Sequence, residues 1–155
     1  MKTLTLIRHA HAGSGIQVSD LDRALSERGH AEAKQQSVLF PFPDNAVLLI
    51  SPSRRTQETA EHWLKKQPHL KSEMVKTLYN ADFETFLEAL ETHHDREHVV
   101  VFAHNPGISE VYHYLTDNWV AFEPCTVATL AFNESKNALE RGNAATLQLQ
   151  FPSQP

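Results

Sequence analysis

The stretch HVVVFAHNPG, residues 98–107, is the clearest indication of the fold class of this chain. Its short, continuous apolar run is typical of a strand that is buried on both faces of a sheet. Pro106 then opens a stretch of helical spacing, whose apolar stripe consists of Ile108, Val111, Tyr112 and Leu115. The sequence therefore predicts a buried strand that leads directly into a helix.

The same alternation of strand and helix extends toward the N-terminus. Apolar runs predict two more buried strands, at Thr3–Ile7 and Ala46–Ser51, and Met74–Tyr79 is a weaker candidate for a strand or an extended connection. Helices are expected in Ser26–Phe40, from Thr56 to the break at Pro68, and from the cap at Asp82 to Leu90. Strands that alternate with helices favour a mostly parallel sheet with both faces covered.

The C-terminal part of the chain has a different pattern. Apolar and polar residues alternate in Thr126–Phe132 and Ala145–Phe151, and residues 133–143 form a polar loop between them. The second alternation is strict and favours a half-exposed antiparallel edge strand, whose apolar face consists of Leu147, Leu149 and Phe151. The predicted fold is α/β: a three-layer α/β/α sandwich with a mostly parallel central sheet and an antiparallel edge strand near the C-terminus.

The composition describes one soluble domain that spans residues 1–155. Lys and Arg number 14 against 19 for Asp and Glu, giving a formal charge of −5, whereas nucleic-acid binders usually carry a basic surface. Cys125 is the single cysteine, so no intramolecular disulfide can form. No apolar stretch has the length of a signal sequence or a membrane span. We therefore expect a cytoplasmic protein that binds neither nucleic acid nor membrane.

Basic side chains follow three of the predicted parallel strands, at the point where each strand ends. Arg8 and His9 follow the first strand, Arg54 and Arg55 follow the second, and His104 ends the stretch HVVVFAH. In open α/β sheets, ligands bind beyond the carboxyl ends of the strands, where helix N-termini add positive potential. None of these three strand ends carries a carboxylate. The sequence therefore predicts a pocket that binds an anion.

The spacing of His9 and His11 also allows a metal site. Such a site could add His104, but it would have no evident carboxylate ligand, and the neighbouring arginines would repel a divalent cation. We therefore favour the anion pocket and expect neither a metal ion nor another cofactor.

Three segments of the chain resemble the signatures of the histidine phosphatase superfamily, in its phosphoglycerate-mutase-like branch. They are LIRHA, SPSRRTQETA and FAHNPG, which occur in the family's order and spacing. Ala10 stands where the first signature usually has glycine. Together with the segment DLDRALSERG, residues 20–29, and the short length, this makes the chain most similar to SixA-type phosphohistidine phosphatases.

The resemblance implies roles for four side chains. His9 would be the catalytic nucleophile, whose neutral imidazole attacks phosphorus and forms a phosphohistidine intermediate. Arg8, Arg55 and His104 would be catalytic and substrate-binding residues that hold the oxygens of the phosphoryl group. The family pattern assigns the arginine role to Arg55, so a surface ion pair is the preferred interpretation of Arg54. His11 has no role in the pattern and is expected in a loop near the pocket mouth.

The chain departs from the superfamily pattern at the general acid. Most members that cleave phosphate esters have a glutamate after the third strand, whereas Asp82 and Glu84 are the nearest carboxylates here, and helix capping explains both. An alkoxide leaving group needs a general acid, but a phosphorylated imidazole departs readily, because its other ring nitrogen can accept a proton from solvent. The favoured substrate is therefore phosphohistidine on a protein, with inorganic phosphate as the product. The alternatives are a general phosphatase for small esters, with Asp82 or Glu84 as the acid, and a non-catalytic phosphate-binding module.

Overall fold

A computed structural model describes residues 1–134 and 136–153 of the chain. At its centre the described strands form one sheet in the order β3-β2-β4-β1-β5-β6. The strands are β1 (Thr3–Arg8), β2 (Val47–Ile50), β3 (Lys71–Met74), β4 (His98–Ala103), β5 (Val127–Phe132) and β6 (Ala144–Gln150). β1 to β4 pair in parallel, whereas β5 is antiparallel to both of its neighbours, β1 and β6. The predicted, mostly parallel sheet is confirmed.

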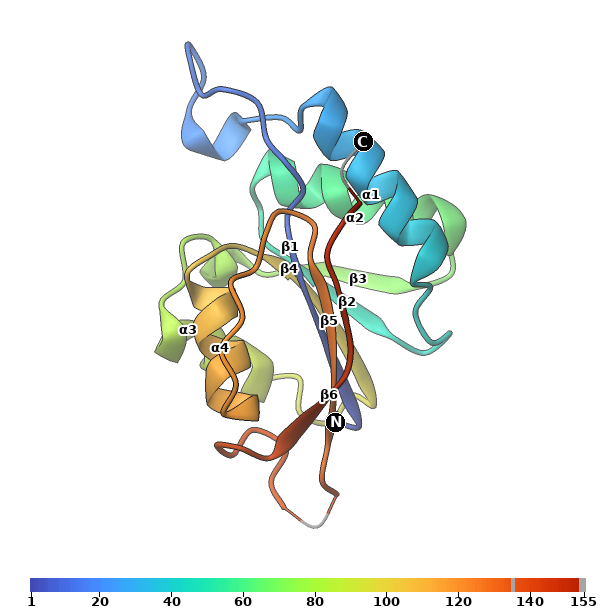
Figure 1. The fold of residues 1–155 in the computed structure, drawn as a ribbon, viewed down its shortest axis with the longest axis vertical. Helices are drawn as coiled ribbons and strands as arrows, with labels where there is room; N and C mark the ends of the chain where they lie inside the picture. The colour runs from blue at the N-terminus through green and yellow to red at the C-terminus, as the bar shows by residue number, and fades with distance from the viewer. Residues whose placement is uncertain (135, 154–155) are drawn as a thin grey trace.

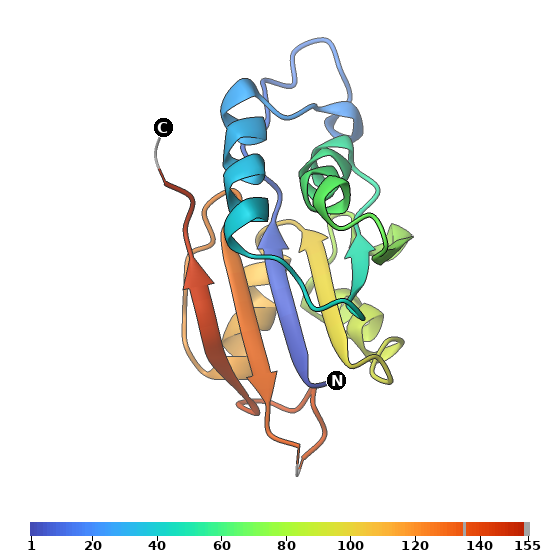
Figure 2. The ribbon, with the colours of Figure 1, turned by 90° about the vertical axis from the view of Figure 1, so that its right-hand side faces the viewer.

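Helices cover both faces of this sheet, which gives the predicted three layers (Figures 1 and 2). The helices are α1 (Glu27–Leu39), α2 (Arg54–Lys66), α3 (Phe83–Glu91) and α4 (Gly107–Thr116), with two short 3-10 helices, η1 (Asp20–Asp22) and η2 (Lys76–Leu78). α1 and α2 lie on one face, and α3 and α4 lie on the other (Figure 2). Among the described residues, no helix combines the length and apolar character that crossing a lipid bilayer requires.

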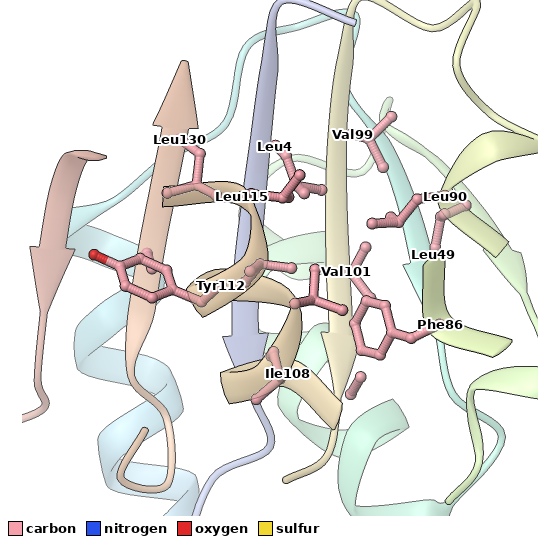
Figure 3. Close-up of a cluster of buried hydrophobic side chains, with 14 of the residues drawn as sticks. Leu4, Leu49, Phe86, Leu90, Val99, Val101, Ile108, Tyr112, Leu115 and Leu130 are labelled. Atoms are coloured by element: carbon pink, nitrogen blue, oxygen red, sulfur yellow. The ribbon is translucent and has the colours of Figure 1, made fainter. Parts of the chain in front are cut away.

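The continuous apolar runs are explained by two cores, one on each face of the sheet. Val99 and Val101 belong to the core under α3 and α4, with Phe86 and Ile108 from those helices (Figure 3). Val100 and Phe102 belong to the core under α1 and α2, where the ring centroids of Trp63 and Phe102 lie 5.4 Å apart. Because successive side chains of a strand point to opposite faces, a strand between two cores needs apolar residues at every position.

Side-chain caps mark the start of three helices, and α2 begins two residues before the expected Thr56. The hydroxyl oxygens of Ser26 and Ser53 accept hydrogen bonds from backbone N–H groups of α1 and α2, and the Asp82 carboxylate does the same for α3. Each of these bonds satisfies an N–H group that has no partner within its own helix. The cap predicted at Asp82 is confirmed.

The weaker strand prediction was wrong in its position. β3 covers Lys71–Met74 rather than Met74–Tyr79, and the chain forms η2 directly afterwards. All four β3 residues are exposed at the edge of the sheet, so the strand needs no apolar run. Leu78, which belonged to the expected strand, is instead buried in the core under α3 and α4.

β6 forms the predicted edge strand and pairs antiparallel with β5, but its apolar face was predicted wrongly. Thr129 pairs with Gln148 and Leu130 pairs with Thr146, so Leu147 is the extra residue of a β-bulge. The bulge interrupts the alternation, and Leu147 is 64% exposed. Phe151 lies beyond the end of the strand and is 40% exposed.

Candidate active site

The carboxyl ends of β1, β2 and β4 lie at one edge of the sheet, beneath the segment that follows β1 (Figure 2). Arg8 ends β1, and the His9 backbone N–H donates to the carbonyl oxygen of Ala103 at the end of β4 (3.1 Å). The His9 and His104 rings have centroids 5.4 Å apart. Arg55 Nη2 lies 3.4 Å from His104 Nδ1. The structure therefore brings the predicted site residues together.

The His9 ring presents one free nitrogen. Its Nδ1 lies 2.8 Å from the carbonyl oxygen of Ala10, which can only accept, so Nδ1 carries the hydrogen and Nε2 keeps its lone pair. Burial lowers the pKa of His9 to about 3, with smaller contributions from His104, Arg55 and Arg8, against the opposing effect of the Ala10 carbonyl. His9 is therefore a neutral imidazole whose Nε2 can act as a nucleophile.

His104 is a second neutral imidazole at the site. Its Nε2 lies 2.7 Å from the Ser51 hydroxyl, and its side chain is almost fully buried at the end of β4. Burial, together with the smaller effect of the positive charge of Arg55, lowers the pKa of His104 to about 4. Ser51 follows β2 directly, so the hydrogen bond joins the ends of two adjacent strands.

Arg8 is held at its far end by the backbone of the loop between α4 and β5. Its Nη1 donates to the carbonyl oxygen of Phe122 (2.7 Å), which also accepts from the Asn105 amide (3.0 Å). Arg8 Nε is buried and has no hydrogen-bond partner among the described residues. Burial and the charge of Arg55 lower the pKa of Arg8 from its ordinary value. The guanidinium is therefore oriented by one bond and keeps donors for an anion.

Arg55 lies in the first turn of α2 and is only 5% exposed. Its Nη1 donates to the backbone carbonyl of Asp20 (2.7 Å), and its Nη2 lies 3.2 Å from an Asp20 carboxylate oxygen. Arg54, by contrast, points outward and pairs with Glu58 at 3.4 Å, with 58% of its side chain exposed. The surface ion pair predicted for Arg54 is confirmed.

Asp20 and Tyr79 lie beside Arg55 and His104, and the sequence indicated neither of them. The Tyr79 hydroxyl donates to Asp20 Oδ2 (2.6 Å), and the Tyr79 ring packs edge-on against His104 with centroids 5.8 Å apart. The hydrogen bond from Tyr79, together with Arg23 and Arg55, lowers the pKa of Asp20 to about 2. Asp20 belongs to the segment DLDRALSERG, which carried part of the family resemblance but indicated no role for this side chain.

A tight turn at residues 123–126 contacts the backbone of Arg8, the last residue of β1, and of His9, the residue after it. The Thr126 N–H donates to the Glu123 carbonyl across the turn (3.1 Å), and Cys125 has a φ of +62°. The Cys125 N–H lies 3.0 Å from the carbonyl oxygen of Arg8 and 3.1 Å from that of His9. A positive φ is usual for the third residue of a type II turn, which most often is glycine. The turn therefore holds the strand end that presents Arg8 and His9.

His11 does not share a site with His9 in this structure. Its Nδ1 lies 2.7 Å from the Ser26 hydroxyl, and its backbone N–H donates to Glu32 of α1 (3.1 Å). His11 therefore connects the loop after β1 to the start of α1. Among residues 1–134 and 136–153, no group of three or more His, Cys, Asp or Glu side chains is arranged to hold a metal ion.

The two carboxylates considered as general acids lie at the start of α3. Asp82 Oδ1 accepts a hydrogen bond from the Thr85 N–H (2.8 Å), which lowers the pKa of Asp82. Glu84 lies in the first turn of the same helix, where its charge complements the helix dipole. The structure thus accounts for both side chains at the helix terminus.

Comparison with known protein families gives one match. Residues 4–86, more than half of the chain, match the model of the histidine phosphatase superfamily, branch 1. The matched segment contains Arg8, His9 and Arg55, whereas His104 lies beyond it. No curated protein sequence matches the chain.

Solved structures show the same fold along almost the whole chain. A SixA from Agrobacterium tumefaciens, assigned as a phosphohistidine phosphatase, has a TM-score of 0.82 at 21% identity, covering 97% of this chain and 98% of that one. A SixA from Nakamurella multipartitia with the same assignment has a TM-score of 0.82 at 23% identity, covering 97% and 96%. The protein histidine phosphatase SixA in complex with tungstate has a TM-score of 0.74 at 19% identity, covering 95% of each chain.

Proposed function

This chain belongs to the histidine phosphatase superfamily, and from that premise we propose that it is a metal-independent phosphatase that removes phosphate from phosphohistidine on a protein. One observation carries the proposal. His9 is a neutral imidazole with its Nδ1 held by the Ala10 carbonyl, and the charges of Arg8, Arg55 and His104 act on its ring.

The first chemical step is an in-line displacement at phosphorus. The Nε2 lone pair of His9 attacks the phosphoryl group, and the bond between phosphorus and the substrate nitrogen breaks as its electrons move to that nitrogen. Arg8, Arg55 and His104 hold the phosphoryl oxygens, on which negative charge is spread during the transfer. Fixed guanidinium groups suit this role because they need no reorganisation during the step.

The second step returns His9 to its starting state. Water attacks the phosphorus of the phosphorylated His9, and the bond between phosphorus and Nε2 breaks to release inorganic phosphate. The Ala10 carbonyl keeps the hydrogen on Nδ1 throughout, so His9 departs as a neutral imidazole rather than as an anion. No metal ion is required in either step.

The low pKa values of two carboxylates, Asp20 and Asp82, favour phosphohistidine over an alkyl phosphate as the substrate. Asp20 has a pKa of about 2 and Asp82 a lowered one, so neither is a proton donor at neutral pH. Cleavage of an alkyl phosphate needs such a donor, whereas cleavage of phosphohistidine does not. The names of the three SixA structures, which refer to phosphohistidine or protein histidine phosphatases, agree with this choice.

Replacing the nucleophile tests the proposal. We expect His9→Ala to lose both turnover of phosphoimidazole and labelling by its radioactive phosphoryl group, because no other side chain replaces the free Nε2. His69→Ala removes an exposed histidine, paired with Asp44, and should retain both activities. Chelators should leave the wild-type rate unchanged. Labelling or turnover in the His9→Ala protein would contradict the mechanism.

The same assay separates the two substrate classes. The wild-type protein should cleave phosphoimidazole with a higher kcat/KM than an alkyl phosphate such as phosphoserine. A preference for the alkyl phosphate that is lost in Asp82→Asn or Glu84→Gln would instead identify an ester phosphatase with a general acid. Tight phosphate binding without turnover on either substrate would identify a binding module.

A further inference from the structure

Asp20 is a carboxylate that contacts Arg55, and the mechanism above gives it no role. Its Oδ2 accepts from the Tyr79 hydroxyl (2.6 Å) and from Arg55 Nη2 (3.2 Å), and its Oδ1 accepts from Arg23 Nη1 (3.1 Å). These donors come from the residue after η2, from α2 and from the residue after η1. Three segments of the chain thus fix one negative charge beside the proposed phosphoryl site.

Exposure to solvent distinguishes Asp20 from the buried side chains around it. Arg55 and His104 are 5% and 7% exposed and form the inner wall, whereas 48% of the Asp20 side chain is exposed. In an in-line displacement, the leaving group departs on the side of phosphorus opposite the nucleophile His9. A phosphorylated residue of another protein reaches phosphorus from the solvent side. We therefore expect the leaving ring on the exposed side of the site, where Asp20 and Tyr79 lie.

We propose that Asp20 determines the specificity of the site by accepting a hydrogen bond from the distal N–H of a protonated phosphoimidazole ring. The proposal rests on the proposed function and adds to it the protonation state of the substrate. A carboxylate beside the departing ring stabilises the imidazolium form of the substrate. The same carboxylate repels the negative charge that develops on the oxygen of a departing alkoxide or phenolate.

The chemistry balances without a proton donor. His9 Nε2 forms its bond to phosphorus, and the electron pair of the broken bond moves to the substrate nitrogen. The distal nitrogen of the ring keeps its hydrogen, so the leaving group is a neutral imidazole. The Ala10 carbonyl holds the distal N–H of His9 in the same manner (2.8 Å). The two rings between which the phosphoryl group moves would then each have an acceptor at the far nitrogen.

A substrate comparison tests the role of Asp20. The probes are phosphoimidazole and p-nitrophenyl phosphate, and the measured quantity is the ratio of their kcat/KM values. We expect Asp20→Asn to lower this ratio about tenfold or more, since hydrogen bonds to charged groups are among the stronger ones. Asp22→Asn is the matched control: Asp22 lies in the same 3-10 helix and accepts from Ser19 instead. The control should keep the wild-type ratio.

The pH dependence of kcat provides a second readout, which disorder of the segment around Asp20 would not reproduce. Because the anion stabilises the protonated ring, Asp20→Asn should move the alkaline limb of kcat for phosphoimidazole to lower pH. Tyr79→Phe keeps the carboxylate and frees one of its oxygens to accept from the ring, so it should not move the limb to lower pH. The charged and titratable groups that face Asp20 are Tyr79, Arg55, Arg23 and His104, and all of them remain in the Asp20→Asn protein.

Several results would overturn the inference. An equal loss on both probes, or an unmoved alkaline limb, would mean that Asp20 only orders the segment over the pocket. If the wild-type protein cleaves phosphoimidazole while Asp20→Asn keeps the wild-type ratio, the inference alone fails. If the wild-type protein cleaves only the ester, through His9, then the proposed substrate is wrong and the inference fails with it.

Discussion

At the scale of single residues, the site depends on imidazoles that stay neutral well below their ordinary pKa. The pKa values of His9 and His104 are about 3 and about 4, against roughly 6.5 for an exposed histidine. Burial is the main cause in both cases, so the same groups influence stability as well as reactivity. In acidic solution, each of these rings is protonated in the unfolded chain and must lose its proton when the chain folds.

This exclusion predicts how stability varies with pH. Between about pH 4 and 6.5 the unfolded chain protonates both rings and the folded chain does not, so the unfolding free energy falls as the pH falls below 6.5. Each ring contributes a slope of up to about 1.4 kcal/mol per pH unit. His9→Asn should reduce the slope measured by urea denaturation near pH 5–6, and the same change at the exposed His69 should reduce it less. An unchanged slope in the His9→Asn protein would contradict the burial of the neutral ring.

Residues directly at strand ends could be predicted from the sequence, and residues brought in by loops could not. Arg8, His9 and His104 end or follow buried strands, so the parallel sheet alone places them at one edge. Asp20 and Tyr79 meet through a 2.6 Å hydrogen bond between segments 59 positions apart. Nothing in local spacing encodes that contact, because it depends on how the loop after β1 folds back over the sheet.

At the scale of elements, α1 approaches the loop after β1 so closely that it requires glycine. A Cβ atom on Gly29 would lie 2.0 Å from the carbonyl oxygen of His11, which is two residues from His9, the proposed nucleophile. Gly29→Ala should therefore lower the unfolding free energy by about 1–3 kcal/mol and also lower turnover, as overpacking moves the loop. Gly13→Ala is the control, since its Cβ would lie at an ordinary 3.7 Å from the Ala24 carbonyl oxygen. Equal stability of the two variants would rule out this close approach.

Sequence patterns predict the central strands of the sheet better than its two edge strands. Central strands are buried on both sides, so β2 and β4 are visible as apolar runs. β3 lies at the edge and exposes every residue, so no apolar pattern marks it. In β6 a bulge at Leu147 breaks the two-residue period that the sequence itself maintains. Edge strands are under weaker packing constraints, and their patterns are correspondingly less informative.

At the scale of the whole molecule, the central strands couple the two cores. β4 contributes Val99 and Val101 to one core and Val100 and Phe102 to the other, so neither core can separate from the sheet alone. We expect unfolding to be a single cooperative transition that involves both layers of helices.

A change in one core should therefore be detected in the other. Phe86→Ala, in the core under α3 and α4, should lower the unfolding free energy by about 3–5 kcal/mol. Fluorescence of Trp63 reports on the opposite core, and circular dichroism reports on all helices; both should give the same midpoint in this variant. Trp119 is 65% exposed and can be replaced by Phe so that the fluorescence comes from Trp63. Two separate midpoints would show that the cores unfold independently.

The bulge in β6 has a consequence for the behaviour of the protein at high concentration. A regular outer strand is a template on which a foreign strand can continue the ladder, and this is how fibrils grow. Leu147 disturbs the ladder on one border, and the opposite border, β3, carries Lys71 and Glu73 on an exposed, four-residue strand. Both edge strands are thus poor templates. We expect the protein to remain monodisperse at concentrations at which a sheet with regular, uncharged edge strands would aggregate.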